Sequence, residues 1–199
     1  MSRSVEVVRT HLELRSPDQL RPARDAEVPA RFVRHDPCPV DHYRRLYRDV
    51  GRAWYWRDRE SWTDEALATL LSSPDIAVWE CLVGDESAGY FELARHDDGA
   101  VEIAYFGLVE RFFGLGLGGA MLTRAAREAW AMGATRVWLH TCTLDSPRAL
   151  PNYKARGFEE FLTERYVAYM GGGGSAMGGG GSAVGGGGSA MGGRGKSDD

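Results

Sequence analysis

The alternation of hydrophobic and polar residues predicts several strands along the chain. Residues 4–14 alternate in this way, which is typical of a strand with one buried face. Three more strands are predicted at residues 75–83, 88–95 and 101–109, separated by connectors of four and five residues. Connectors this short form hairpin turns, so the three strands should pair antiparallel.

Two helices are predicted before these hairpins. Asp41 is the expected N-cap of a helix over residues 42–50, which Gly51 ends. Thr63 is the expected N-cap of a second helix, over about residues 64–71. Two serines and a proline at residues 72–74 should end that helix.

Two more helices are predicted after the third hairpin strand. The first follows a glycine-rich turn and gathers apolar side chains on one face, namely Leu117, Met121, Leu122, Ala125 and Ala129. The second is short, with Ser146 as its expected N-cap and Pro147 at its first position, and it ends near Gly157. Pro151 should kink this last helix or restart it.

The remaining strands complete an α/β (α+β) fold. Residues 135–142 follow a strand and a helix, so a right-handed crossover should place them parallel to residues 101–109. Residues 158–170 predict a final strand, and the pair at 32–33 marks one short element, helical or extended. The prediction is one domain over residues 1–170, with a mixed sheet of six to seven strands and about four helices.

Residues 171–199 differ in composition from the rest of the 199-residue chain. They repeat four glycines, a serine and an alanine, and end in a short charged segment. Such a sequence buries too little apolar surface to offset its ordering entropy, so a flexible tail is predicted. Native low-complexity sequence and an engineered linker would both have this composition.

Composition and charge exclude several classes of protein. Three cysteines, Cys38, Cys81 and Cys142, are few and widely spaced, which favours a reduced cytoplasmic setting and shows no metal-ligand spacing. No metal site is therefore predicted. The net charge of −4 argues against nucleic-acid binding, and no apolar stretch suits a signal peptide or membrane span.

The glycine-rich turn at residues 114–119 is the main candidate for binding an anion. Glycine allows close backbone approach, and the first N–H groups of the following helix have no partner within it. Those donors suit a phosphate or pyrophosphate. The letters also match a dinucleotide fingerprint, but four residues separate strand from turn and no acidic residue stands about 20 positions on, so that reading is rejected.

The same turn resembles the acetyl-CoA site of the GCN5-related N-acetyltransferase (GNAT) family. The motif glycines align with Gly116 and Gly118, and residues 149–158 resemble the family's closing motif, A-x-x-x-Y-x-x-x-G-F. Glu102 lies on the preceding strand, 14 residues before Gly116, where several members carry a glutamate. The family's basic position falls on Phe113, so Arg111 or backbone amides would have to contact the anion.

The resemblance implies an acetyl-CoA site in a splay between two parallel strands. In the family, the pantetheine arm pairs with the exposed strand as an added strand would. Gly107 in mid-strand fits such a close approach, or a bulge. The residues implied in cofactor binding are Phe106, Leu108, Val109, Phe113, Gly114, Leu115, Gly116, Leu117, Gly118, Gly119 and Asn152.

Two catalytic residues are implied by the same resemblance. An alkyl ammonium has a pKa near about 10.4, so it needs a base; Glu102 is the candidate, with burial expected to raise its pKa. Tyr153 is the candidate acid for the departing thiolate. Each residue also has a purely structural alternative: Glu102 could simply face solvent, and Tyr153 could simply pack under the sheet. His140 and Asp145 could relay a proton and hold the amine, with structural roles as their alternatives.

The functional prediction is an acetyl-CoA-dependent N-acetyltransferase. It would act by direct attack of a primary amine of a small molecule or peptide. The alternative is a non-catalytic acyl-CoA-binding regulatory module. Aromatic residues at 54–62 would either anchor a loop or line the acceptor pocket. Many members of the family form dimers, so the sequence leaves both a monomer and a homodimer as alternatives.

Overall fold

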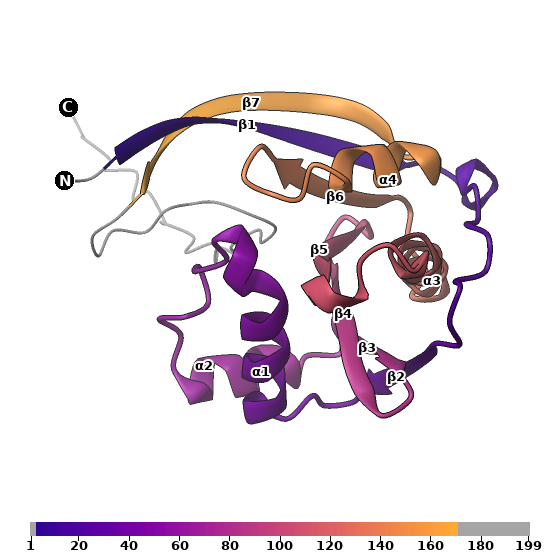
Figure 1. Cartoon of the computed structure of the whole chain (residues 1–199), viewed down its shortest axis with the longest axis horizontal. Helices are drawn as coiled ribbons and strands as arrows, with labels where there is room; N and C mark the ends of the chain where they lie inside the picture. The colour runs from indigo at the N-terminus through magenta and orange to yellow at the C-terminus, as the bar shows by residue number, and fades with distance from the viewer. Residues whose placement is uncertain (1–2, 171–199) are drawn as a thin grey trace, which may run out of the picture.

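Seven strands form one mixed sheet in the computed structural model, which describes residues 3–170 (Figure 1). The order across the sheet is β2-β3-β4-β5-β6-β1-β7. The strands are β1 (Arg3–Leu14), β2 (Arg31–His35), β3 (Ile76–Val83), β4 (Glu86–Arg95), β5 (Val101–Leu108), β6 (Val137–Cys142) and β7 (Glu159–Met170). The predicted α/β class is confirmed, and residues 32–33 belong to strand β2. The predicted tail lies outside the described residues.

Four α-helices accompany the sheet, as predicted. They are α1 (Val40–Gly51), α2 (Asp64–Leu71), α3 (Leu117–Ala131) and α4 (Ala149–Ala155). Thr63 caps α2, since its side chain accepts a hydrogen bond from the Ala66 N–H at 3.2 Å. No helix in residues 3–170 combines the length and apolar character needed to cross a membrane.

Two predicted helix starts are wrong. Helix α1 begins one residue before Asp41, with Pro39 at the N-cap. Helix α4 begins at Ala149 rather than at Pro147, and Arg148 occupies its N-cap. Pro151 is therefore in the first turn of α4, where a missing N–H breaks no helical hydrogen bond, so the proline neither kinks nor restarts the helix.

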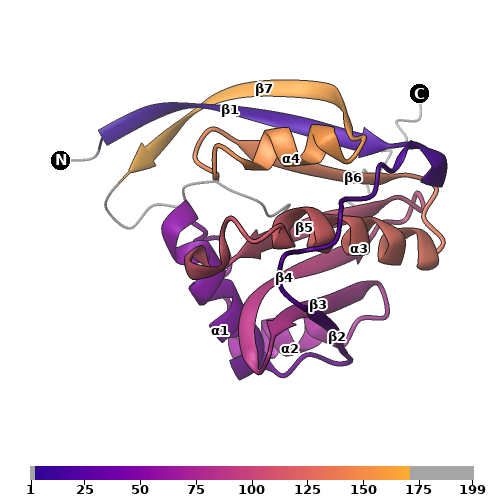
Figure 2. The ribbon, with the colours of Figure 1, turned by 45° about the vertical axis from the view of Figure 1, so that its right-hand side comes forward.

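The first strand of the chain lies in the second half of the sheet. Strand β1 is antiparallel to β6 on one side and to β7 on the other, with Leu12 opposite Leu139 and Val7 opposite Tyr166. Figures 1 and 2 show β1 and β7 as two long, curved, neighbouring strands above α4. Alternation identified this strand but carries no information about its neighbours.

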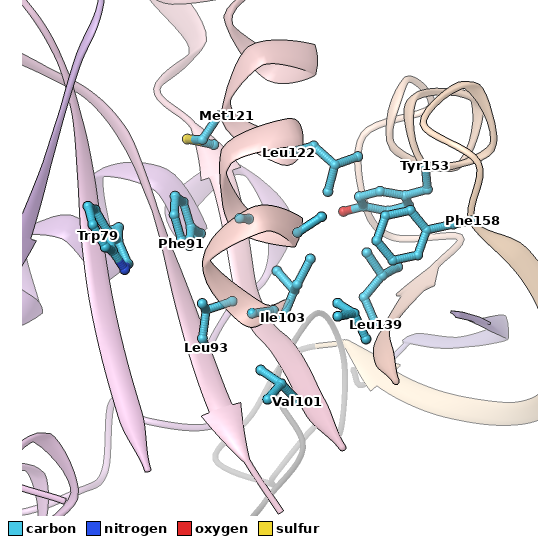
Figure 3. Packing of buried hydrophobic residues seen from close by; sticks show 14 of the residues in the cluster. Trp79, Phe91, Leu93, Val101, Ile103, Met121, Leu122, Leu139, Tyr153 and Phe158 are labelled. Carbon is cyan, nitrogen blue, oxygen red and sulfur yellow. The ribbon is translucent and has the colours of Figure 1, made fainter. Parts of the chain in front are cut away.

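Helices cover the two faces of strands β2–β5 separately. Helix α3 packs on one face, and α1 and α2 pack on the other (Figure 1). Figure 3 shows Trp79, Phe91 and Leu93 pointing toward α3. The residues between them in β3 and β4, such as Tyr90, point toward α1 because successive side chains of a strand alternate.

The parallel strands β5 and β6 separate after two residue pairs. Val101 pairs with Val137 and Glu102 with Trp138, and the ladder ends there. Strand β5 continues to Leu108 while staying paired with β4. A register shift opposite Ala104 marks a bulge that turns the strand at this point. The predicted splay is confirmed.

Candidate functional site

A pocket of about 290 Å³ lies where β5 and β6 have separated. Its walls come from β5, the glycine turn, the end of β6 and helix α4. Most predicted cofactor residues line it, namely Phe106, Leu108, Phe113, Gly114, Gly116, Gly118, Gly119 and Asn152. Segments far apart in the sequence therefore meet at one concave site, as expected of a ligand pocket.

Three predicted cofactor residues do not line the pocket. The Leu117 side chain is fully buried in the core under α3. The Leu115 carbonyl accepts a hydrogen bond from the Glu27 N–H at 3.0 Å, and the Val109 N–H donates to Ala88 at 2.9 Å. These two hydrogen bonds hold the glycine turn in place and leave the other backbone groups of Leu115 and Val109 for a ligand.

The glycine turn presents the start of α3 to the pocket. Gly114 and Gly116 have φ values of +85° and +75°, a left-handed conformation that side chains disfavour. Gly116 is the N-cap of α3, so the free N–H groups of the first turn follow it directly. The Asn152 amide donates to the Gly118 carbonyl at 3.2 Å and joins this turn to α4.

The arginines near the glycine turn are not the one that the sequence suggested. Arg111 forms an exposed ion pair with Glu86 at 3.1 Å and does not line the pocket. Arg148 lines the pocket from the start of α4. Arg156 lies against the first turn of α3, since a Cβ at Gly119 would come 2.7 Å from its Nη1. Its Nε is buried without a hydrogen-bond partner within residues 3–170.

Glu102 is buried where β5 and β6 are still paired. Its side chain is 1% exposed and does not line the pocket. The alternative of a solvent-facing glutamate is therefore wrong. His96 Nε2 lies 3.2 Å from Oε2, and His140 Nδ1 lies 3.6 Å from Oε1.

The expected rise in the pKa of Glu102 is also wrong. Burial alone would raise that pKa, but the contacts with His140 and His96 outweigh burial and lower it. The same contact raises the pKa of His96. Glu102 is thus held as a carboxylate between two imidazoles.

His140 connects Glu102 to the pocket. Its side chain is 3% exposed and lines the pocket, while His96 on the other side of Glu102 is 32% exposed. Neither ring nitrogen of His140 has a hydrogen-bond partner within residues 3–170. The geometry therefore places a buried imidazole, in contact with the Glu102 carboxylate, at the pocket and a more exposed histidine on the other side of that carboxylate.

Tyr153 and Asp145 occupy the α4 side of the pocket. The Tyr153 ring packs edge-on against Phe106 with centroids 6.0 Å apart, and burial raises the pKa of its phenol. It both packs under the sheet and lines the pocket. Asp145 accepts hydrogen bonds from Thr141 Oγ1 and the Cys142 N–H, each at 2.8 Å, which is the loop-capping role.

The aromatic segment at 54–62 contains both anchors and lining residues. Trp54 and Trp56 line the pocket, and Trp56 is also buried against Tyr47 and Tyr105. Arg59 fixes the segment to the sheet through two hydrogen bonds to Glu92, of 2.7 and 2.8 Å. Packing and pocket lining are therefore combined in one segment.

Gly107 is required by packing as well as by the pocket. It lines the pocket, but a Cβ there would come 2.4 Å from Val50 Cγ1 of helix α1. The bulge proposed for this position lies instead at Ala104. Helix α1 thus approaches β5 closely beside the point where the strands separate.

Comparisons with known proteins agree with this geometry. The model of the "Acetyltransferase (GNAT) family" matches residues 43–158. A mycothiol acetyltransferase of Corynebacterium efficiens is 32% identical over 126 residues, covering 60% of this chain and 40% of that protein. The chain thus spans well under half the length of this relative.

Solved structures share the fold at low identity. A GCN5-related N-acetyltransferase from Kribbella flavida superposes with a TM-score of 0.58 at 22% identity, covering 85% of this chain and 61% of that one. One from Sphaerobacter thermophilus gives 0.56 at 17% identity, covering 83% and 51%. At these identities the likeness concerns the arrangement of elements.

Proposed function

Because the chain belongs to the acetyltransferase (GNAT) family, we propose that it transfers an acetyl group from acetyl-CoA to a primary amine of a small molecule or peptide. The observation that carries the proposal is the pocket between the separated ends of β5 and β6, with a glycine turn and a helix start in its wall. The unpaired edge of β5 would pair with the pantetheine arm, and the free N–H groups of α3 would contact the pyrophosphate.

Arg156 and Arg148 would supply the positive charge that Phe113 does not. Arg156 lies beside Gly119 at the start of α3, and Arg148 lines the pocket. A hydrogen bond to a charged group contributes about 1.5–3 kcal/mol, so Arg156→Met should weaken CoA binding by about tenfold or more. Calorimetry with CoA measures this, and Arg111→Ala is the matched control with unchanged affinity. Equal losses in both variants would contradict the assignment.

The amine proton would leave the pocket through His140. The amine nitrogen attacks the thioester carbonyl carbon, and the carbon–sulfur bond breaks as the amide forms. His140 would accept the proton lost by the amine, with the Glu102 carboxylate stabilising the imidazolium so formed. His96, on the surface side of Glu102, would exchange the proton with solvent. Glu102 thus acts through a histidine rather than on the amine itself.

Tyr153 would protonate the CoA thiolate. Burial keeps its phenol protonated until the thiolate forms, the ring lines the pocket beside Phe106, and the tyrosinate left by the transfer would regain a proton from solvent once the products leave. Its structural packing makes Tyr153→Phe a suitable test, since the ring is kept and only the hydroxyl is lost. Tyr166→Phe, on strand β7, is the matched control.

Turnover of acetyl-CoA with a panel of amines tests the reaction. Free CoA should be released, and Glu102→Gln and His140→Gln should each lower kcat by about 100-fold or more, the scale of general-base catalysis. Their CoA affinity should stay the same, and the exposed Glu86→Gln is the control. Tight CoA binding without turnover on any amine would favour the regulatory module. The relative named above makes amines related to mycothiol an early choice for the panel.

A further inference from the structure

Three potential metal ligands meet at the end of the molecule away from β7. His35 ends β2, His42 lies in the first turn of α1, and Glu80 belongs to β3. Their ligand atoms all lie within 4.8 Å of one another. Figures 1 and 2 show β2, β3 and the start of α1 together at the lower end, while β6, α4 and β7 lie at the upper end.

The two imidazoles converge on one carboxylate oxygen. His35 Nε2 and His42 Nε2 each lie 2.9 Å from Glu80 Oε2, and the ring centroids are 4.6 Å apart. The histidine side chains are 21% and 24% exposed, and that of Glu80 is 6% exposed. The carboxylate therefore forms the floor of the cluster and the imidazoles its open rim.

We propose that His35, His42 and Glu80 form a binding site for a divalent transition metal of the zinc class. Two imidazole nitrogens and one carboxylate oxygen are a ligand set that zinc uses when a fourth position stays open to water. Bonds of about 2.1 Å place tetrahedral ligands about 3.4 Å apart, so the carboxylate oxygen needs to separate only slightly from each imidazole nitrogen. The bound ion would fasten the edge strand β2 and helix α1 to β3.

The residues around the cluster provide an outer shell. Ser87 of β4 hydrogen-bonds the Glu80 side chain and orients the carboxylate. Arg45 Nη2 lies 3.1 Å from His42 Nδ1 and donates to it, so the His42 proton is on Nε2 in this state. Metal binding at Nε2 moves that proton to Nδ1 and requires Arg45 to turn away. Arg45 is exposed and has room to do so.

Calorimetric titration of the untagged, chelator-treated full chain with zinc sulfate tests the proposal. One ion should bind per chain, and zinc should raise the thermal midpoint. Changes in an outer shell alone weaken metal affinity by about 10- to 100-fold, so His35→Gln and His42→Gln should each weaken binding by about 100-fold or more. CoA affinity, measured in the same samples, shows that each variant is folded.

Two control variants separate this site from adventitious binding. His11→Gln removes a histidine that lies 2.8 Å from the Glu164 carboxylate on the other half of the sheet, and it should leave zinc binding unchanged. Arg45→Gln removes the donor to His42 Nδ1 and should tighten binding. No zinc binding by the folded chain, or binding that survives loss of both His35 and His42, would overturn the proposal. An unchanged or weaker affinity in Arg45→Gln would contradict His42 Nε2 as a ligand.

Discussion

The two faces of strands β2–β5 are stabilised in different ways. The core under α3 consists of apolar side chains, among them Phe91, Leu93 and Leu122 (Figure 3). The core under α1 and α2 is rich in aromatic residues and encloses a buried ion pair between Arg59 and Glu92. One face therefore depends mainly on apolar packing, and the other depends also on buried polar groups that must all be satisfied.

This difference matches what each face holds. Helix α3 carries the glycine turn, so a rigid apolar core keeps in place the backbone that we propose binds the pyrophosphate. The opposite face holds the loop with Trp54 and Trp56, which contains only a three-residue 3-10 helix and short turns, and side chains anchor it to the sheet. The Arg59 guanidinium also lies over the Tyr105 ring, 4.5 Å from its centroid.

Breaking the buried ion pair should have the largest effect. Glu92→Ala leaves the Arg59 charge buried without a partner, which should lower the free energy of unfolding by about 3–5 kcal/mol. Urea denaturation measures this. The double variant Arg59→Met with Glu92→Met removes both charges and should recover most of the loss. If the double variant is as unstable as Glu92→Ala, the unpaired charge is not the cause.

An apolar truncation under α3 should cost somewhat less. Leu122 is fully buried against the sheet, and Leu122→Ala removes packing without exposing a charge. The expected loss is about 2–5 kcal/mol in the free energy of unfolding. Xenon or benzene binding to the cavity would identify the mechanism. A loss well below 1 kcal/mol would mean that α3 settles onto the sheet and fills the space.

The paired end of β5 should give stability a pH dependence. The contact with Glu102 raises the pKa of His96, so this pair stabilises the fold fully below the ordinary histidine pKa of about 6.5 and loses that effect as pH rises through the raised pKa. His96→Gln should therefore be less stable than the parent at pH 5.5, with the gap narrowing by pH 8.5. Urea denaturation at both values checks this, and a gap independent of pH would contradict it.

The exposed Arg111–Glu86 pair should matter least. Exposed ion pairs contribute about 0–1 kcal/mol, so Arg111→Ala should change the free energy of unfolding by no more than that. CoA affinity should also stay unchanged, in contrast to Arg156→Met. A loss of CoA affinity in Arg111→Ala would show that Arg111 leaves Glu86 when the cofactor binds.

Local patterns predicted most of the elements. Hydrophobic periodicity identified the six longer strands, and hairpin-length connectors predicted the antiparallel order of β3, β4 and β5. The place of β1 between β6 and β7 could not be predicted, because alternation says which face is buried and not which strand is the neighbour. The start of α4 was missed since Ser146 and Pro147 match a helix start that the chain does not use.

The pocket was predicted where motif and topology coincide. Residues 106–119 are consecutive in the chain, so a local motif and a predicted crossover were sufficient to predict that they lie beside the gap between β5 and β6. His140 was predicted as a possible proton relay, and His96 lies six residues before Glu102 across the β4–β5 connector, whereas only the fold brings Arg156 to Gly119. A contact between an arginine and a glycine far along the chain leaves no periodic signal in the sequence.

The position of β1 also sets the order in which the protein can assemble. Synthesis makes this strand before the other six strands of the sheet, yet its two partners, β6 and β7, are the last two of the seven to be made. Residues 3–14 therefore stay without their strand partners until more than two thirds of the described chain has left the ribosome. Strand β1 therefore pairs late with β6 and β7, through contacts between residues far apart in the sequence. Pairing of this kind slows folding.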